Sequence, residues 1–457
     1  MLASCTHNPN DGVKNPVETT GLPVSANIRS EESGLSPERF LGYGFNLVAH
    51  HRDDQDGMSR VSVLDMERIN NRTPWNPWNT SVDPTKMPRP KIIVSTETTP
   101  RPHYSDMGEN QDSYNFEDVN IGSDGMFQKV SFDIDYNKTT EYNVKFHIRR
   151  SFCYDINHKV ALKGLPKVYS YYISELFYYD LTALPAEELV QEYGTHLVTS
   201  YNLGAFTNLI FYANASVFSS NESTEIACSL LGAELDSEIA RKAKENRDAL
   251  SVRYSQGGSD YFPENLVWSP EKFEFGVTKG VDPKEWYAKK RPGDDPFISL
   301  STSDGLISIP DLIPDPYLKL KYACGILHAT NPGKKIQYVI CDPDTFEPIK
   351  LSNGFIYFTN TSFSSVDVNI YYGNKMMYFS PSTLGQGSST SSVWSVQILP
   401  DGRATLRHRT GSYLTKNLTL LKANQPTEEC YFVLNPIMPQ KGDGSDLYAW
   451  DNIMFKK

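Results

Sequence analysis

The residues with the clearest potential for chemistry lie in the run Tyr193-Gly194-Thr195-His196. Histidine is the usual general base of enzymes, and here it adjoins a threonine hydroxyl. Nothing else in the sequence completes a catalytic site, because there is no G-x-S-x-G elbow, no H-E-x-x-H zinc helix and no Walker loop. We therefore expect His196 to pack or to hydrogen bond, and we expect no catalytic residues and no enzyme activity.

Metal chemistry is not expected either. The six cysteines are scattered and lack the close pairing that a zinc site or a CxxC motif requires. Residues 53–57 are rich in aspartate like a calcium loop, but Arg52 and Val63 stand where its first and last ligands would be. We expect no cofactor and no bound metal.

Composition favours a multidomain, β-rich protein. The chain has 457 residues, of which 12% are aromatic, and aromatic side chains pack well on the half-buried surface of a sheet. A net charge of -11 argues against a nucleic-acid partner, which would need a concentrated basic surface. No apolar run approaches the roughly 20 residues of a membrane-spanning helix, so any insertion into lipid would have to use strands.

The strongest periodic signal is an alternation of apolar and polar residues between positions 130 and 149. The apolar positions are Val130, Phe132, Ile134, Tyr136, Tyr142, Val144, Phe146 and Ile148. Because the polar break at 138–141 is short, the segment predicts an antiparallel hairpin with one apolar and one charged face. In water the apolar face needs a protein cover, whereas in a membrane it could face lipid, so we treat it as a candidate membrane hairpin.

Further elements follow along the chain. The aromatic stretch 168–180 has strand composition, and residues 181–190 predict a short helix with Pro185 in its first turn. A strand is expected over 203–212, and an amphipathic helix or helix pair over 225–250. Strand character returns at Val252 and Tyr254, before Gly257 and Gly258.

Tyr193-Gly194-Thr195-His196, followed after six residues by Leu203-Gly204-Ala205, resembles the signature of the membrane attack complex/perforin family. The resemblance covers about residues 35–329 and departs from the family at Ala205, where a second glycine is usual, and at Leu197, where an aromatic residue is usual. It implies an α+β fold, in which a bent four-stranded antiparallel sheet is flanked by two helical clusters that unfurl into amphipathic hairpins. Gly204, Gly257 and Gly258 would then serve as bend or hinge residues.

By the same resemblance, the two clusters fall between residues 120 and 165 and between about 214 and 252. The periodicity of the first region already indicates a hairpin, so it is either a segment able to adopt both structures or an ordinary extension of the sheet. In the second region the mixed charges would make a poor lipid-facing strand.

The two ends of the chain carry separate signals. Leu2-Ala3-Ser4-Cys5 resembles a bacterial lipobox, so we expect Cys5 to be lipidated, residues 1–34 to be a tether, and the segment upstream of the lipobox to be missing or trimmed. The run Asn331-Pro332-Gly333 marks a boundary, after which residues 330–457 predict an all-β domain, either trefoil-like or a sandwich. In this family such domains usually recognise a target surface.

Two functions fit these features. The first is a perforin-like protein of the bacterial surface, lipid-anchored in the outer membrane or secreted, which is a monomer in solution, self-associates on target membrane lipids and inserts hairpins to form a pore. It would act against competing bacteria or on host cells, with a surface glycan or protein receptor bound by residues 330–457. The alternative is a non-lytic adhesin or carbohydrate-binding lipoprotein that keeps the same fold.

Overall fold

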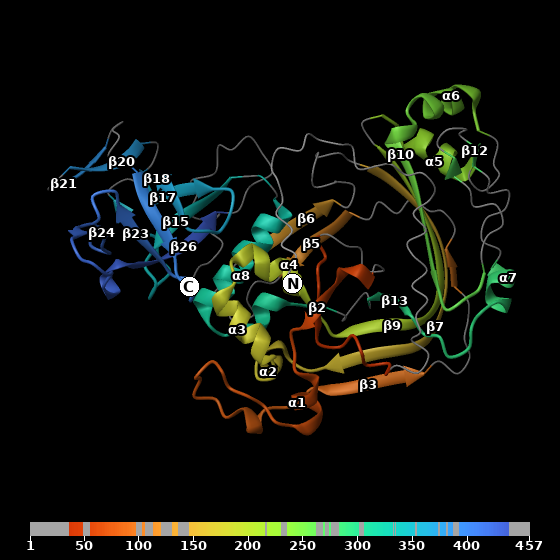
Figure 1. Cartoon of the computed structure of the whole chain (residues 1–457), viewed down its shortest axis with the longest axis horizontal. Helices are drawn as coiled ribbons and strands as arrows, with labels where there is room; N and C mark the ends of the chain where they lie inside the picture. The colour runs from red at the N-terminus through yellow and green to blue at the C-terminus, as the bar shows by residue number, and fades with distance from the viewer. Residues whose placement is uncertain are drawn as a thin grey trace, which may run out of the picture.

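The structure is a computed structural model of the chain (Figure 1). It describes residues 36–48, 55–96, 103–105, 113–119, 130–135, 146–214, 217–229, 235–261, 268–269, 274–275, 283–300, 306–331, 333, 335–351, 354–372, 375–380, 383–386 and 393–437. Most of residues 36–331 form a mixed α/β part, and the strands after residue 335 form an all-β part. Both halves of the expected fold class are therefore confirmed.

Two long antiparallel strands form the centre of the molecule: β7 (Phe146–Lys163) and β9 (Ser200–Asn214). On the β9 side they are flanked by β10 (Leu250–Gly257) and β13 (Phe297–Leu300), and on the β7 side by β3 (Lys91–Thr96) and β4 (His103–Ser105). Two shorter strands, one after the other, therefore pair along the outer edge of each long strand. The expected bent, four-stranded antiparallel sheet is present.

A single bend divides this sheet into two arms. At the bend Asn157 bulges out of β7 opposite Gly204 of β9, since Ile156 pairs with Gly204 and His158 with Leu203. The proximal arm contains β13, β3 and the adjoining parts of β9 and β7, and the distal arm contains β10, β4 and the remainder of the two long strands. Figure 1 shows the distal arm curving away from the body of the molecule.

The body beside the proximal arm is built from a small sheet and several helices. Its strands follow the order β14 (Leu306–Ser308), β8 (His196–Val198), β1 (Tyr43–Phe45), β2 (Met58–Ser62). Its helices are α1 (Met66–Asn71), α2 (Pro166–Tyr169), α3 (Glu175–Ala183), α4 (Ala186–Tyr193) and α8 (Pro316–Thr330). Side-chain caps begin three of them, because Asp65, Ser174 and Asp315 accept hydrogen bonds from first-turn amides.

The expected strand over 168–180 is wrong, because this stretch forms α2, a connection and the start of α3. Its aromatic residues are enriched because they fill the core: Tyr169, Tyr172 and Phe177 are all buried. The Ser174 hydroxyl accepts from the Phe177 amide and begins the helix locally. The helix expected over 181–190 is confirmed in α4, although Pro185 precedes its first turn rather than lying in it.

Two segments connect neighbouring strands at the tip of the distal arm. The first, between β4 and β7, contains the paired strands β5 (Ser113–Val119) and β6 (Val130–Asp135). The second, between β9 and β10, contains α5 (Ser220–Ser229) and α6 (Ser237–Glu245), which confirms the expected helix pair. We call them the first and second insertions.

The expected pairing of residues 130–137 with 142–149 is wrong. Strand β6 pairs with β5, and residues 146–149 pair with residues 211–214 of β9. Tyr136, Tyr142 and Val144 of the candidate membrane hairpin lie outside the described residues. Alternation predicted the strands correctly, but it contains no information on the partner of each strand.

Strands β15 to β26 form the C-terminal part; their bounds are β15 Ile336–Cys341, β16 Lys350–Leu351, β17 Gly354–Asn360, β18 Val366–Asn369, β19 Tyr371–Tyr372, β20 Lys375–Ser380, β21 Thr383–Gln386, β22 Val393–Ile398, β23 Ala404–His408, β24 Tyr413–Leu414, β25 Leu420–Leu421 and β26 Tyr431–Ile437. The order β18-β22-β23-β26-β15-β17 places the first strand of this part beside the last. Strand β17 also contacts β18, which follows it in the chain, and the remaining strands branch off as short hairpins. This ring of six strands is trefoil-like and differs from the two stacked sheets of a sandwich.

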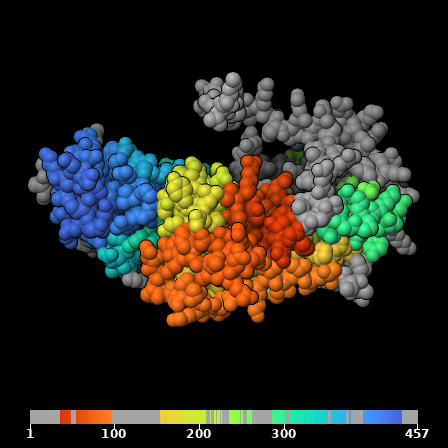
Figure 2. All heavy atoms as spheres, turned by 60° about the horizontal axis from the view of Figure 1, so that its bottom comes forward, coloured from red at the N-terminus to blue at the C-terminus, as the bar shows by residue number. Residues whose placement is uncertain are grey.

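One hydrophobic core extends through both parts of the protein. It includes Phe177 and Tyr193 of the body, Leu320 of α8, and Val339 and Phe432 of the C-terminal strands. Figure 2 shows the C-terminal strands, in blue, lying directly against the yellow helical region. Cys324 and Cys341 are buried free thiols in this core, and Cys430 is a further buried free thiol.

Candidate functional site

The run Tyr193-Gly194-Thr195-His196 lies where α4 ends and β8 begins. Tyr193 is fully buried, and its hydroxyl donates to Asp180 Oδ2 at 2.7 Å. Burial, together with this carboxylate, raises the pKa of the tyrosine hydroxyl well above its ordinary value. The Thr195 hydroxyl donates to the Phe45 carbonyl at 3.1 Å and lies 2.8 Å from His196 Nδ1. The Tyr193 bond joins α4 to α3, and the Thr195 bond joins the start of β8 to β1.

The three glycines expected at a hinge all lie at the bend. A β-carbon on Gly204, whose φ is +152°, would lie 2.1 Å from the Asp155 carbonyl oxygen of β7. A β-carbon on Gly257 would lie 2.7 Å from a carbon of Pro296, and one on Gly258, at φ +67°, would lie 2.8 Å from Ala205 Cα. The tight approach of neighbouring backbones explains why residues without a side chain occupy these positions.

Ala205 stands where the family signature has its second glycine. Its methyl group is tolerated because the residue it faces, Gly258, has no side chain. Ala205 also joins Tyr261 and Trp286 in a small buried cluster separate from the main core. The departure from the signature is therefore matched by local packing.

Both insertions leave the sheet at the same end. The first occupies roughly 40 residues between Ser105 and Phe146, and the second roughly 35 residues between Asn214 and Leu250. A strand that crosses a membrane needs about 9 to 11 residues. Each insertion is therefore long enough for two such strands and a turn.

In the first insertion, the apolar residues of β5 and β6 oppose one another in register. Phe116 pairs with Phe132 and Tyr114 with Ile134, while the polar residues Asn115 and Asp133 pair between them. Because successive residues of a strand belong to opposite faces, this register gives the hairpin one apolar and one polar face. The register and sequence of β5 and β6 thus make this strand pair amphipathic.

In the second insertion, an ion pair connects the two helices. Lys242 Nζ of α6 lies 2.7 Å from Glu222 Oε1 of α5 and 5.4 Å from the ring centre of Phe218. Glu222 also accepts from the Ser219 amide, while Ser219 Oγ accepts from the Glu222 amide, which makes a capping box. The bond from Lys242 and the bond from the Ser219 amide lower the pKa of the Glu222 carboxyl to about 2.

Residues 113–262 match the family model of the MAC/Perforin domain, and this range includes most of the first insertion, all of the second, the signature and the bend. The chain contains a MAC/Perforin domain. The match covers about a third of the chain, and the family is one of perforin-like, pore-forming proteins. No curated protein shows significant sequence similarity to this chain.

Solved structures of three proteins are among those similar to this chain. GNIP1Aa from Chromobacterium piscinae is 13% identical, with 87% of this chain and 82% of that chain covered and a TM-score of 0.37. A candidate cell invasion protein with MAC/Perforin domain from Bacteroides thetaiotaomicron is 18% identical, with 71% and 67% covered and a TM-score of 0.39. Astrotactin-2, a vertebrate-specific, perforin-like membrane protein involved in neuronal development, is 12% identical, with 75% and 55% covered and a TM-score of 0.28.

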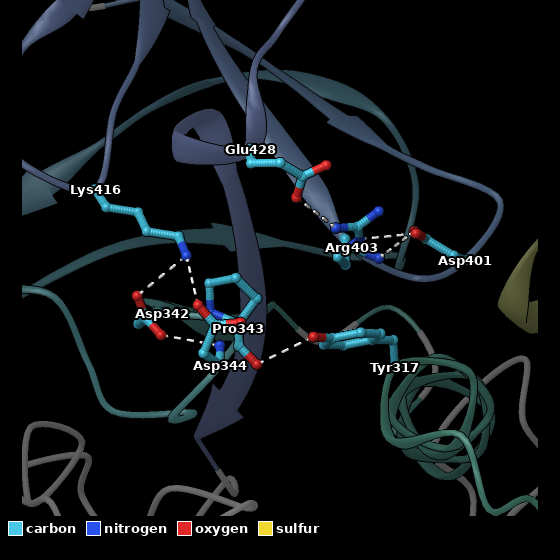
Figure 3. A network of polar contacts seen from close by, with 8 residues as sticks. All are labelled: Tyr317, Asp342, Pro343, Asp344, Asp401, Arg403, Lys416 and Glu428. Carbon is cyan, nitrogen blue, oxygen red and sulfur yellow. Dashed lines mark hydrogen bonds and ion pairs between the residues drawn. The ribbon is translucent and has the colours of Figure 1, made fainter. Parts of the chain in front are cut away.

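The C-terminal strands are docked on helix α8, which passes between them and the MAC/Perforin domain. Arg403 lies over the rings of Tyr317 and Tyr431, and its guanidinium pairs with Asp401 at 2.7 Å and with Glu428 at 3.5 Å (Figure 3). In the same network Tyr317 donates its hydroxyl hydrogen to the Pro343 carbonyl at 3.2 Å. A stacked, doubly paired guanidinium of this kind fixes orientation as well as position.

Figure 3 also shows ion pairs within the C-terminal part itself. Lys416 Nζ lies 2.9 Å from a carboxylate oxygen of Asp344 and 3.5 Å from one of Asp342. Deeper in the interface, Glu187 of α4 accepts from the Phe363 amide at 2.5 Å. Because buried and exposed contacts both join the two parts, residues 335–437 are held on the MAC/Perforin domain rather than carried on a free linker.

Sequence reasoning missed the charged residues at the bend and at this interface. Asp155 of β7 is fully buried, and Lys321 of α8 is buried between the Leu181 and Pro400 carbonyls. Neither residue lies in a motif, so no sequence signal could have found it. Cys5 lies outside the described residues, among which no group of three or more His, Cys, Asp or Glu is placed to hold a metal ion.

Within the same described ranges, no helix is long and apolar enough to cross a membrane.

Proposed function

We propose that this protein oligomerises on a target membrane and inserts its two insertions as amphipathic hairpins to form a pore. The observation that carries the proposal is their arrangement: both leave the tip of the same long sheet, where they could extend β7, β9 and β10 as continuous strands. In hydrocarbon every backbone amide needs a partner, so inserted hairpins must pair with those of neighbouring copies around a closed ring.

The first insertion supports the proposal directly. Its in-register hairpin already separates apolar from polar residues, as a strand pair between lipid and water requires.

The second insertion supports it once α6 is considered as a strand. One set of alternate residues contains Leu235, Ile239 and Ala243, and the other contains Glu238, Lys242 and Lys244. Two charged residues, Arg241 and Glu245, are out of place on the apolar side. A cation at the membrane midplane costs about 2–4 kcal/mol, a carboxylate costs less, and both costs fall near the interface, so these two residues oppose insertion without preventing it.

The C-terminal strands would select the target, through a surface glycan, a protein receptor or the lipids themselves. Their fixed position on α8 supports this role, since a bound target would then hold the bent sheet at a constant height and orientation.

Insertion is tested by placing single cysteines in turn along residues 237–245 and labelling each with an environment-sensitive fluorophore. On liposomes, we expect labels at Ile239 and Ala243 to report an apolar surrounding and labels at Ala240 and Lys242 to report water. The change from the helical period to a period of two identifies strand formation. Release of an enclosed dye is followed in the same samples.

A matched pair of variants provides the control. Arg241→Leu removes a charge from the proposed lipid face and should increase dye release, whereas Lys242→Leu adds an apolar residue to the opposite face and should not. If binding to liposomes occurs with no release and no period of two, the pore function is refuted. The mixed charge of the second insertion favours the remaining candidate, a non-lytic surface adhesin with this fold.

We also propose that the protein acts at the cell surface, either anchored in the outer membrane through a lipid on Cys5 or secreted. Support comes from the lipobox-like run Leu2-Ala3-Ser4-Cys5. Metabolic labelling with a fatty-acid analogue in a bacterial host should mark the wild type and not Cys5→Ser. Equal labelling of both would refute the anchor.

A further inference from the structure

A buried polar cluster lies where helix α8 meets the C-terminal strands. Cys324 and His328 lie one turn apart on the same face of α8, with 0% and 5% of their surfaces exposed. Tyr338 of β15, which is 1% exposed, lies against both, and the carboxylate of Glu187 acts on them from α4. We call these four residues the interface cluster.

One hydrogen bond within the cluster joins the two parts of the protein. It connects Nε2 of His328 to the Tyr338 hydroxyl, and the centres of the two rings lie 6.0 Å apart. The Thr361 carbonyl lies near the imidazole, but no described atom is placed to hydrogen bond with Nδ1. Either tautomer of the neutral imidazole can make the bond to the tyrosine, because a hydroxyl both donates and accepts.

The surroundings of the cluster favour uncharged side chains. Burial lowers the pKa of His328 below its ordinary value of 6.5, and the Glu187 carboxylate and the Thr361 carbonyl offset only part of this effect. Burial also raises the pKa of the Tyr338 hydroxyl and of the Cys324 thiol well above their ordinary values. The tyrosine and the cysteine therefore stay uncharged in both acidic and neutral solution.

Other charged side chains that pack on α8 lie in or against its first two turns. Lys319 Nζ lies 3.8 Å from Asp311, Lys321 donates to two backbone carbonyls, and Arg403 lies over the Tyr317 ring. Among these groups and the interface cluster, the imidazole is the one whose ordinary pKa lies between pH 5 and pH 8. A change of pH in that range therefore acts on this interface through the histidine.

Protonation changes what the ring can bind. An imidazolium donates from both nitrogens and accepts at neither, so the Tyr338 hydroxyl can no longer donate to His328. The Cys324 thiol, which also lies beside that hydroxyl, is a weak acceptor. A cation is also costly to hold away from water. A proton on His328 thus favours an open interface, in which water reaches the ring.

We propose that the interface cluster is an acid-sensitive latch, which holds the C-terminal strands on α8 while His328 is neutral and releases them when the ring takes a proton. Release lets the C-terminal strands change their orientation relative to the bent sheet. The latch is independent of pore formation, because it governs how the two parts are joined in a pore-former and in an adhesin alike.

The sign of the pH effect follows from proton binding. As the pH falls from 6.5 to the lower pKa of the docked ring, the open interface binds a proton that the docked interface does not, so docking weakens. Well above pH 6.5 the ring is neutral in both states. From pH 7.5 to 5.0 the open population should rise by at most about 30-fold, the limit for a ring that stays neutral while docked.

The Phe363 amide is a direct probe of docking, because it donates to Glu187 across the interface. Its hydrogen exchange is measured on the full chain at pH 7.5, 6.0 and 5.0 and corrected for the intrinsic rate. Amides of β15, which pairs with β17 and β26 inside the C-terminal part, are followed in the same samples. We expect exchange at Phe363 to accelerate about three- to thirtyfold from pH 7.5 to 5.0, with no acceleration in β15.

Two variants identify the ring responsible. His328→Gln keeps a polar side chain that cannot titrate in this range, and it should abolish the acceleration. His158→Gln removes a histidine whose side chain is 21% exposed and which lies outside the interface, so it should respond to pH like the wild type. Nuclear magnetic resonance titration of the wild-type His328 ring, assigned through its contact with Tyr338, tests the latch even if His328→Gln fails to fold.

Four results would each overturn the latch. The first is equal exchange of the Phe363 amide at pH 7.5 and 5.0, and the second is equal acceleration in the wild type and in a folded His328→Gln. The third is a His328 ring that titrates at or above pH 6.5. The fourth is acceleration of β15 together with Phe363, which means that the C-terminal part unfolds instead of undocking. None of these measurements uses a membrane, so failure of the pore function leaves them unaffected.

Discussion

The buried lysine at the interface between α8 and the C-terminal strands predicts an unusual dependence of stability on pH. Lys321 Nζ donates to the Leu181 carbonyl at 3.0 Å and to the Pro400 carbonyl at 3.4 Å. Burial lowers the pKa of this lysine from 10.5 to about 8, partly offset by the negative charge of Asp401. At neutral pH the folded protein therefore holds a charged ammonium in a place that disfavours the charge.

The sign of the effect follows from proton binding. Between about pH 8 and pH 10.5 the unfolded chain keeps the lysine proton and the folded protein loses it, so the free energy of unfolding rises with pH across this window. From these two pKa values, the rise between pH 7.5 and 9.5 is at most about 2 kcal/mol. Below about pH 7 the group is almost fully protonated in both states and contributes little further change.

Urea unfolding followed by tryptophan fluorescence, at pH 7.5 and 9.5, measures this rise. Comparison of the wild type with Lys321→Met isolates it, because the ionisation of other groups is common to both proteins. Lys86→Met, which removes an exposed lysine, should respond to pH like the wild type. If Lys321→Met and the wild type respond equally to pH, the buried-ammonium argument is refuted.

Three further outcomes are expected. Gly204→Ala should lower the thermal midpoint by far more than Gly293→Ala. A β-carbon at Gly204 would lie 2.1 Å from a carbonyl oxygen of β7. A β-carbon at Gly293 would have no atom within 4 Å, so only the positive φ of that residue, which costs about 1–2 kcal/mol, would destabilise the variant. Gly325→Ala, whose β-carbon would lie 2.2 Å from a carbonyl oxygen of α4, should separate α4 from α8 and reduce stability to urea by about 1–3 kcal/mol; an unchanged midpoint would contradict the close helix crossing. The bond from Lys242 lowers the pKa of Glu222 to about 2, so the ion pair between α5 and α6 should persist from pH 7 down to pH 4.5 and be lost only as the pH falls from about 4.5 through 2. Hydrogen exchange of α5, corrected for the intrinsic rate, should therefore show equal protection at pH 7 and pH 4.5. Glu222→Gln should lose less than about 1 kcal/mol of that protection.

Local pattern determined much of this protein. The alternation at 130–134 and the strand composition of 203–212 predicted strands, the period of four at 225–250 predicted helices, and the signature around His196 and Gly204 indicated a bent sheet. These signals suffice because strand and helix periodicity and the intolerance of a tight bend for side chains are properties of short stretches of chain.

Partner choice, by contrast, was decided only by the tertiary structure. Strand β6 pairs with β5, and residues 146–149 pair with β9, because register and neighbours depend on which faces meet in space. The aromatic stretch 168–180 contains the end of α2 and the start of α3. Its tyrosines are enriched because they are buried in the core, and not because they belong to a sheet. The buried charges of Asp155 and Lys321 lie far in sequence from the residues that bind them, so their roles follow from three-dimensional proximity alone.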